Sequence, residues 1–177
     1  MWNEILETAR QEFSDVPDVV QLTRLLLRLG LAMALGAIIG YERESRDSSA
    51  GLRTHMLVAL GTALFVLVPL QAGMDADGMS RVIQGLLAGI GFLGAGAVIK
   101  QSESGHVRGL TTAAGIWTTA AIGMTVGLGR ETTAIISTVL VLVILSLLLR
   151  LERRIVKGKE ERGEISSGER QVREHDS

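Results

Sequence analysis

The feature that most constrains this chain is a series of five long apolar runs separated by short polar breaks. The runs lie near residues 19–40, 55–70, 81–100, 110–128 and 132–149. A run approaching 20 apolar residues is long enough to cross the ~30 Å hydrocarbon core of a bilayer as a helix. The breaks are too short to fold separately. The sequence therefore predicts an all-α integral membrane protein, a bundle of about five transmembrane helices within residues 18–149.

The two ends of the chain are more polar than the runs between them. Residues 1–17 carry apolar side chains at helical spacing, at Trp2, Ile5, Leu6, Ala9 and Phe13. This spacing is typical of an amphipathic helix, which would lie on the membrane surface or pack on the bundle. Residues 150–177 are charged and contain Gly and Ser, which predicts a polar tail with no core of its own.

The distribution of Lys and Arg predicts the orientation of the chain, because basic loops stay in the cytoplasm. With five spans, one side of the membrane collects ten basic residues, from residues 41–54, 100–109 and 150–159. The other side has three, at Arg10, Arg81 and Arg130. We therefore expect the N-terminus outside and the tail in the cytoplasm.

The composition and motifs argue against several classes of protein. The chain has no Cys, which excludes disulfides and thiolate metal sites. Residues 89–94 fit the pattern GxGxxG, but they lie inside a membrane-length apolar run and not after a strand, so we interpret the match as accidental. No GxxxxGK[ST] motif, nucleophile–base pair or metal-ligand set is visible. We expect no enzyme, no cofactor, no metal site and no nucleic-acid partner.

The third apolar run is dense in glycine, and glycines four residues apart recur elsewhere. Such GxxxG steps let a second helix approach closely, which promotes helix association within a membrane. The candidate packing glycines are Gly36, Gly40, Gly85, Gly89, Gly91, Gly94, Gly96, Gly123 and Gly127. The alternative is that the glycines unwind the third helix and expose backbone carbonyls to a solute, as in broken transporter helices.

A polar group is expected at the cytoplasmic ends of the helices. Its members are Glu42, Arg43, Arg53, Thr54, His55, Arg108, Thr111 and Thr112, with Lys100 and His106 nearby. Positive loops that hold the topology would explain the arginines, but not the acidic residues among them. A cluster that binds an anion, a lipid head group or a partner is the sharper hypothesis.

Three further polar residues fall within or at the edge of the apolar runs, at Arg28, Arg81 and Gln84. An ionisable side chain as deep as Arg28 is a functional candidate, unless it snorkels to the interface beside Arg24. Gln84 could hydrogen-bond across a helix interface or contact a solute. The apolar interiors contain no Asp or Glu, so the chain is poorly equipped to move divalent cations.

Four consecutive strings together resemble the MgtC/SapB family of bacterial inner-membrane proteins. They are RLGLAMALGAIIGYERE, AGLRTHMLVALGTAL, RVIQGLLAGIGFLGAGAVIK and VRGLTTAAGIWTTAAIGMTVGLG. The resemblance implies a multi-pass inner-membrane bundle of four to five helices, in a family associated with growth in low magnesium, acid tolerance and survival inside host cells. Members of the MgtC type continue into a soluble C-terminal domain, so we expect this chain to belong to the short SapB-like branch.

Two functions remain open at this point. The first is a non-enzymatic regulator of membrane ion homeostasis or stress adaptation, which packs its glycine faces against another membrane protein or its own copy. The second is a small channel or carrier for an ion or small solute, lined by the third run and the cytoplasmic polar group. The missing buried carboxylates favour the first function, whereas Arg28 and the glycine-dense helix favour the second.

Overall fold

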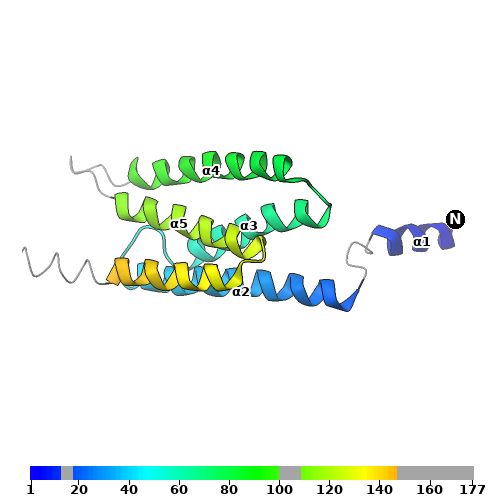
Figure 1. Cartoon of the computed structure of the whole chain (residues 1–177), viewed down its shortest axis with the longest axis horizontal. Helices are drawn as coiled ribbons and strands as arrows, with labels where there is room; N and C mark the ends of the chain where they lie inside the picture. The colour runs from blue at the N-terminus through cyan, green and yellow to red at the C-terminus, as the bar shows by residue number, and fades with distance from the viewer. Residues whose placement is uncertain (13–17, 100–108, 147–177) are drawn as a thin grey trace, which may run out of the picture. The chain divides into compact units, whose positions relative to one another are not determined.

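The computed structural model describes residues 1–12, 18–99 and 109–146 of the chain. These residues form helices and no strand, which confirms the predicted all-α class. The helices are α1 (Trp2–Glu12), α2 (Val19–Glu44), α3 (Leu52–Gln71), α4 (Ala76–Ile99) and α5 (Leu110–Gly127), followed by a helix over Glu131–Ser146 (Figure 1). The chain divides into two compact units at residue 138, and the packing below concerns the first. The expected tail, residues 150–177, lies outside the described residues.

The ends of the first long helices differ from the sequence-based expectation. α2 begins where Asp18 caps it, since the Asp18 carboxylate accepts a hydrogen bond of 2.6 Å from the Gln21 amide. It continues four residues beyond the predicted end at residue 40, so the acidic and basic residues at 42–44 lie on its last turn. α3 begins at Leu52, three residues before the predicted start, and its first amide donates 2.8 Å to the Glu44 carboxylate.

α3 runs through Pro69 but ends only two residues later, at Gln71. Proline lacks an amide hydrogen and disrupts the hydrogen bond to the preceding turn, so a helix rarely extends far beyond it. Gly73 follows in the left-handed region, at φ 75°. α4, by contrast, is an unbroken helix over all 24 of its residues despite its glycines.

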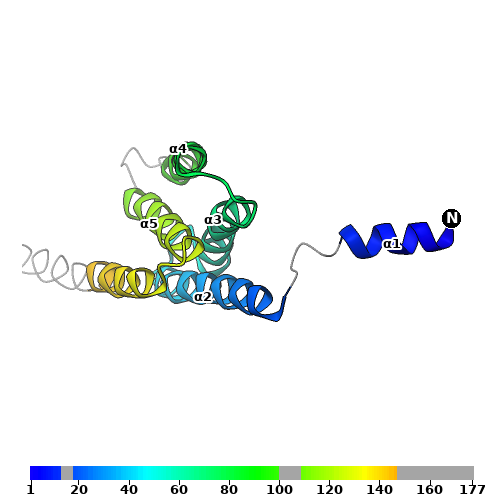
Figure 2. The ribbon, with the colours of Figure 1, turned by 45° about the vertical axis from the view of Figure 1, so that its right-hand side comes forward.

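α2, α3 and α5 pack against one another and form the centre of the bundle. α4 packs on α5 and only loosely on α3, and Figure 2 shows it at the edge of the bundle, with α5 between it and α2. The largest fully buried apolar side chains come from the three central helices, at Ile39, Val66, Leu67, Ile122 and Val126. α4 is therefore the long helix with the most exposed surface.

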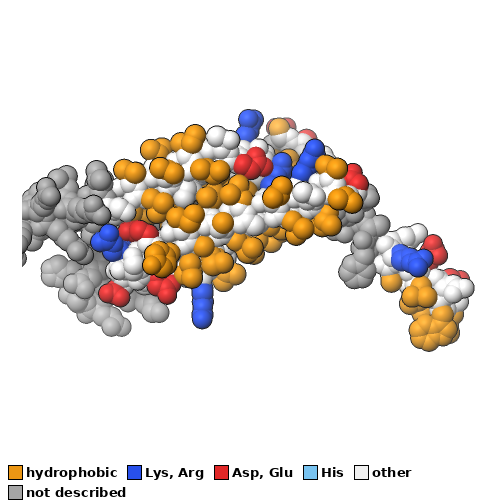
Figure 3. Space-filling model, turned by 90° about the horizontal axis from the view of Figure 1, so that it is seen from below, with side chains coloured by type: hydrophobic (Ala, Val, Ile, Leu, Met, Phe, Trp, Pro, Cys, Tyr) orange, Lys and Arg blue, Asp and Glu red, His pale blue; other side chains and the backbone are white. Residues whose placement is uncertain are grey.

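The outward faces of the bundle are apolar. Figure 3 shows hydrophobic side chains spread over one face of the molecule. The exposed large hydrophobic residues of the first unit include Leu26, Phe65 and Phe92. In water such a surface would drive aggregation, whereas in lipid it is the stable outer surface of a helix bundle. α2, α3 and α4 are each long and apolar enough to cross a membrane. The chain is a helical membrane protein.

Candidate functional site

Two of the three predicted glycine pairs lie in contact with α3. A Cβ atom on Gly36 would lie 2.7 Å from the His55 carbonyl oxygen, and one on Gly40 would lie 2.7 Å from the Cα of Leu52. On α5, a Cβ on Gly123 would meet the backbone of Ala59 of α3, and one on Gly127 would lie 2.7 Å from the Ala63 carbonyl oxygen. Only hydrogen fits at these positions, so the glycines set how closely α2 and α5 approach α3.

The glycines of α4 have different surroundings. A Cβ atom added at Gly85, Gly89, Gly91 or Gly96 would meet no atom within 4 Å. At Gly94 the added atom would make ordinary contact with the Ala113 side chain of α5, at 3.6 Å. Most of the glycine-rich surface of α4 is therefore open within this chain.

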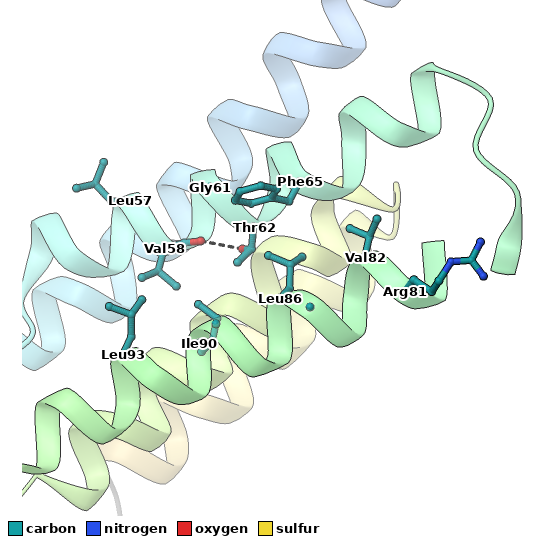
Figure 4. A pocket seen from close by; sticks show the side chains of 12 residues that line it. Leu57, Val58, Gly61, Thr62, Phe65, Arg81, Val82, Leu86, Ile90 and Leu93 are labelled. Carbon is teal, nitrogen blue, oxygen red and sulfur yellow. Dashed lines mark hydrogen bonds between the residues drawn. The ribbon is translucent and has the colours of Figure 1, made fainter. Parts of the chain in front are cut away.

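The open surface of α4 lines an apolar groove of about 680 Å³ between α3 and α4. Figure 4 shows Leu57, Val58 and Phe65 of α3 and Val82, Leu86, Ile90 and Leu93 of α4 around this groove. Arg81 stands at one end, where its side chain is exposed. The groove offers shape and apolar surface, but almost no hydrogen-bonding groups.

A group of charged side chains lies at the end of α2. Arg43 is buried, and its Nε lies 3.2 Å from Oε2 of Glu42. Arg46, one turn later, places its Nε 3.4 Å from Oε1 of the same carboxylate. These distances fit ion pairs, but the angles do not complete hydrogen bonds, since neither oxygen of Glu42 nor Nε of Arg43 has a hydrogen-bond partner among the described residues.

His55, next to this charged group, is completely buried between α3 and α5. Its Nδ1 shares a hydrogen bond of 2.7 Å with the Thr119 hydroxyl, while Nε2 has no hydrogen bond within the described part of the chain. Gly115 of α5 lies against the ring, and a Cβ there would make ordinary van der Waals contact, 3.5 Å from His55 Cε1 and 3.8 Å from Arg43 Cδ. We call Glu42, Arg43, His55 and Thr119 the buried polar cluster.

The buried polar cluster contains four buried atoms without a hydrogen bond: both Glu42 oxygens, Arg43 Nε and His55 Nε2. Buried polar atoms in proteins are nearly always hydrogen-bonded, to protein or to ordered water. The Glu42 carboxylate accepts hydrogen bonds and the Arg43 guanidinium donates them, so the buried polar cluster can hold water or a small polar solute.

The other residues of the predicted cytoplasmic polar group are not part of the buried polar cluster. Thr112 is buried and shares a hydrogen bond of 3.0 Å with Ser48. Thr54 is half-buried, and Arg53 and Thr111 are exposed. Arg108, Lys100 and His106 lie outside the described residues.

Arg28 is paired in the structure. Its Nε donates 3.2 Å to Oε1 of Glu131, and its Nη1 lies 3.5 Å from the Gly127 carbonyl oxygen. The side chain retains 29% of its exposure, so it reaches a partner at the edge of the bundle and is not enclosed in the core. Its neighbour Gly129 has φ 74°, and a Cβ there would collide with the Arg28 guanidinium.

Sequence reasoning did not connect these partners. Glu131 lies in the short break between the fourth and fifth apolar runs and is not among the predicted site residues. Thr119 and Gly115 are also not among them, although Thr119 follows Thr112 by seven residues and Gly115 follows Thr111 by four, a spacing that places such residues on one helix face. Gln84 was predicted to hydrogen-bond across a helix interface or to contact a solute. Its side chain is exposed, and its Nε2 lies 3.5 Å from Oγ of Ser80 on the same helix. No group of three His, Cys, Asp or Glu residues that could hold a metal occurs in the described ranges.

The MgtC family model matches residues 29–154 of this sequence. The chain belongs to the MgtC family. Protein SrpB of Synechococcus elongatus is 46% identical to this member over 140 residues, which cover 73% of this chain and 77% of SrpB. Protein MgtC of Salmonella typhimurium is 44% identical over 130 residues, 73% of this chain and 54% of that protein.

YhiD of Escherichia coli K12, whose name describes it as a candidate magnesium transporter, is 38% identical to this MgtC-family chain over 138 residues. The match covers 74% of this chain and 63% of YhiD. The resemblance stated from the sequence strings is thus confirmed, while the chain spans about half the length of Salmonella MgtC. No solved structure matches the chain.

Proposed function

We propose that this MgtC-family protein is a non-enzymatic regulator of membrane ion homeostasis or stress adaptation, which acts by docking the open glycine face of α4 onto another transmembrane helix. The observation that carries the proposal is the contrast among the three GxxxG pairs. Two are filled by α3, while Gly85 and Gly89 face a groove with no protein atom against them. In lipid, close approach of backbones at small residues is a main source of helix association.

The occupant that we propose is α4 of a second copy of this chain. Asp77, Arg81, Gly85 and Gly89 follow one another at intervals of four residues, so they form one ridge of the helix. Two copies inserted in the same direction bring their α4 helices together in parallel, which sets Arg81 of one near Asp77 of the other. Both side chains are exposed, and neither forms an ion pair with another described residue.

We further propose five spans in a bacterial inner membrane, with the N-terminus outside and the C-terminus in the cytoplasm. The basic loops support this orientation. The apolar helix over Glu131–Ser146 and the short α5 supply the two spans beyond α2, α3 and α4. The link to magnesium and acid stress rests on the family, and on the name of YhiD.

The test is association of the full chain in native membranes, measured by crosslinking and by energy transfer between labelled copies. Gly85→Leu and Gly89→Leu should lower association at least tenfold and abolish growth of a deletion strain in low magnesium or acid. Gly30→Leu is the matched control, because a side chain at Gly30 also meets no atom within 4 Å but lies on α2. Intact association and growth in both α4 variants would refute the proposal.

Exchanging the charges of Asp77 and Arg81 tests whether the docked helix belongs to a second copy of this chain. Asp77→Arg or Arg81→Asp alone should weaken association by repulsion between like charges, and the double variant should restore it. If the glycine variants abolish growth while the wild-type chain never associates with itself, the partner is a different membrane protein and the second-copy proposal is wrong.

A carrier is the second candidate, and the buried polar cluster is the observation that favours it. Its four atoms without hydrogen bonds could hold a hydrated ion or relay a proton. The unbroken helix of α4 gives no support to a pathway of unwound backbone. Reconstitution in liposomes with Mg²⁺-, K⁺- and proton-sensitive dyes tests the carrier: flux that Glu42→Gln abolishes would support it, and absence of flux from folded protein would exclude these ions.

A further inference from the structure

A second, smaller cavity lies between the start of α2 and the end of α3. It measures about 260 Å³ and has four polar side chains in its lining, at Gln21, Arg24, Arg28 and Gln71. Three leucines complete the wall. All four polar side chains can donate hydrogen bonds, and no acidic side chain lines the cavity.

The charges around this cavity leave an excess of one positive charge. Arg28 is balanced by Glu131, which accepts a hydrogen bond from its Nε. Arg24 is exposed and forms no ion pair within the described part of the chain. The cavity therefore presents a net charge of about +1, which a singly charged anion would neutralise.

The last carbonyl groups of α3 do not account for the two arginines. A helix C-terminus attracts cations when its final carbonyls lack partners. Here the turn after α3 supplies those partners: the amides of Ala72, Gly73 and Met74 donate to the carbonyls of Val68, Leu70 and Pro69, at 3.0–3.1 Å. Arg24 is thus available to a ligand, together with Nη2 of Arg28, since Glu131 and the Gly127 carbonyl take Nε and Nη1 of that side chain.

The depth of the cavity in the membrane follows from the length of α3. Its 20 residues span about 30 Å, which equals the thickness of the hydrocarbon core. The cavity is lined by the last two turns of α3, through Gln71, so it lies where the acyl chains meet the head groups. Leucines beside arginines and amides suit a ligand with a charged head and an apolar body.

We propose that this cavity is a binding site for a phosphate monoanion at the membrane surface, held by Arg24 and Arg28 with the Gln21 and Gln71 amides. Guanidinium groups donate paired, charge-assisted hydrogen bonds to phosphate oxygens, which makes arginine the preferred ligand for this group. The phosphodiester of an anionic phospholipid and free inorganic phosphate share this chemistry. The site is independent of the α4 groove and lies at the start of α2, where both arginines precede the matched family region, residues 29–154.

The test is a titration of the purified full chain in neutral detergent, followed by native mass spectrometry and thermal unfolding. The probes are dioleoyl phosphatidylglycerol, dioleoyl phosphatidylcholine and sodium phosphate. Arg24→Gln is the main variant, because Arg24 has no ion pair in the fold that its loss would break. We expect it to weaken binding roughly tenfold, the loss of one charge-assisted contact. Arg53→Gln removes an exposed charge from the other end of α3 and is the matched control.

Each result decides the source of the anion or rejects the site. Binding of phosphatidylglycerol over phosphatidylcholine, reduced by Arg24→Gln but not by Arg53→Gln, assigns the site to a lipid head group. Binding of sodium phosphate with the same dependence assigns it to free phosphate. Equal loss in both variants would show unspecific attraction, and binding of neither anion would also overturn the proposal. Neither negative result bears on association through α4.

Discussion

We predict that one added methyl group lowers the stability of the protein at Gly36 but not at Gly85. Gly36 lies in the interior of α2 against α3, and Gly85 lies in the interior of α4 on its open face. Both changes to alanine gain the same helix propensity, about 1 kcal/mol, because alanine restricts the unfolded chain more than glycine does. The two variants therefore differ only in what the methyl group meets.

The methyl group of Gly36→Ala would lie 2.7 Å from the His55 carbonyl oxygen and 2.9 Å from the Ala59 Cβ. The nearer contact is a backbone atom, which cannot rotate away. To restore an ordinary separation of 3.4 Å, α2 must move from α3 by about 0.7 Å. Overpacking of this kind costs ~1–3 kcal/mol. The difference in unfolding free energy between Gly85→Ala and Gly36→Ala should therefore be about 1–3 kcal/mol.

The assay is thermal unfolding of each full-length variant in one detergent, monitored by tryptophan fluorescence. Gly36→Ala should unfold several degrees below Gly85→Ala, and Gly85→Ala at or slightly above the wild-type chain. Equal midpoints for the two variants would refute the assignment of Gly36 to a tight contact. A midpoint of Gly85→Ala well below wild type would show instead that its surface is covered, and a monomeric state in the same detergent would place that cover within the chain and not in a second copy.

Two further comparisons test the polar contacts. Gly129→Ala and Gly73→Ala carry the same left-handed backbone penalty, at φ 74° and 75°, but only the first places a methyl group against Arg28, so it should lower the thermal midpoint further; equal effects would argue against that contact. Thr119→Val keeps the side-chain shape but leaves the buried Nδ1 of His55 without a partner, which should cost ~1–3 kcal/mol in the same assay. An unchanged midpoint would mean that the ring finds water or another acceptor.

Helix formation and membrane character could be read from the sequence, because both depend on local patterns. A run of apolar residues long enough to span a bilayer forms a helix, since no water is present to satisfy its backbone. The ends of the helices were less predictable from the sequence. The first apolar run ends at residue 40 in the sequence, but α2 continues to Glu44, whose carboxylate accepts a hydrogen bond from the first amide of α3.

The partners of the polar side chains could not be predicted, since they come from distant parts of the chain. Arg28 and Glu131 are 103 residues apart, and His55 and Thr119 are 64 apart. The sequence left two alternatives for Arg28, a functional residue or a side chain that snorkels to the interface, and nothing near it identified an acidic partner. Only the packing of the helices brings these side chains within hydrogen-bond distance.

The three glycine pairs separate what the sequence determines from what only the tertiary structure determines. The spacing of Gly36–Gly40, Gly85–Gly89 and Gly123–Gly127 marks three possible contact faces, because residues four apart lie on one side of a helix. The spacing is the same in all three, so it cannot say which faces are filled. Tertiary structure decides this: α2 and α5 pack against α3 through their glycines, whereas α4 lies at the edge of the bundle and leaves Gly85 and Gly89 open.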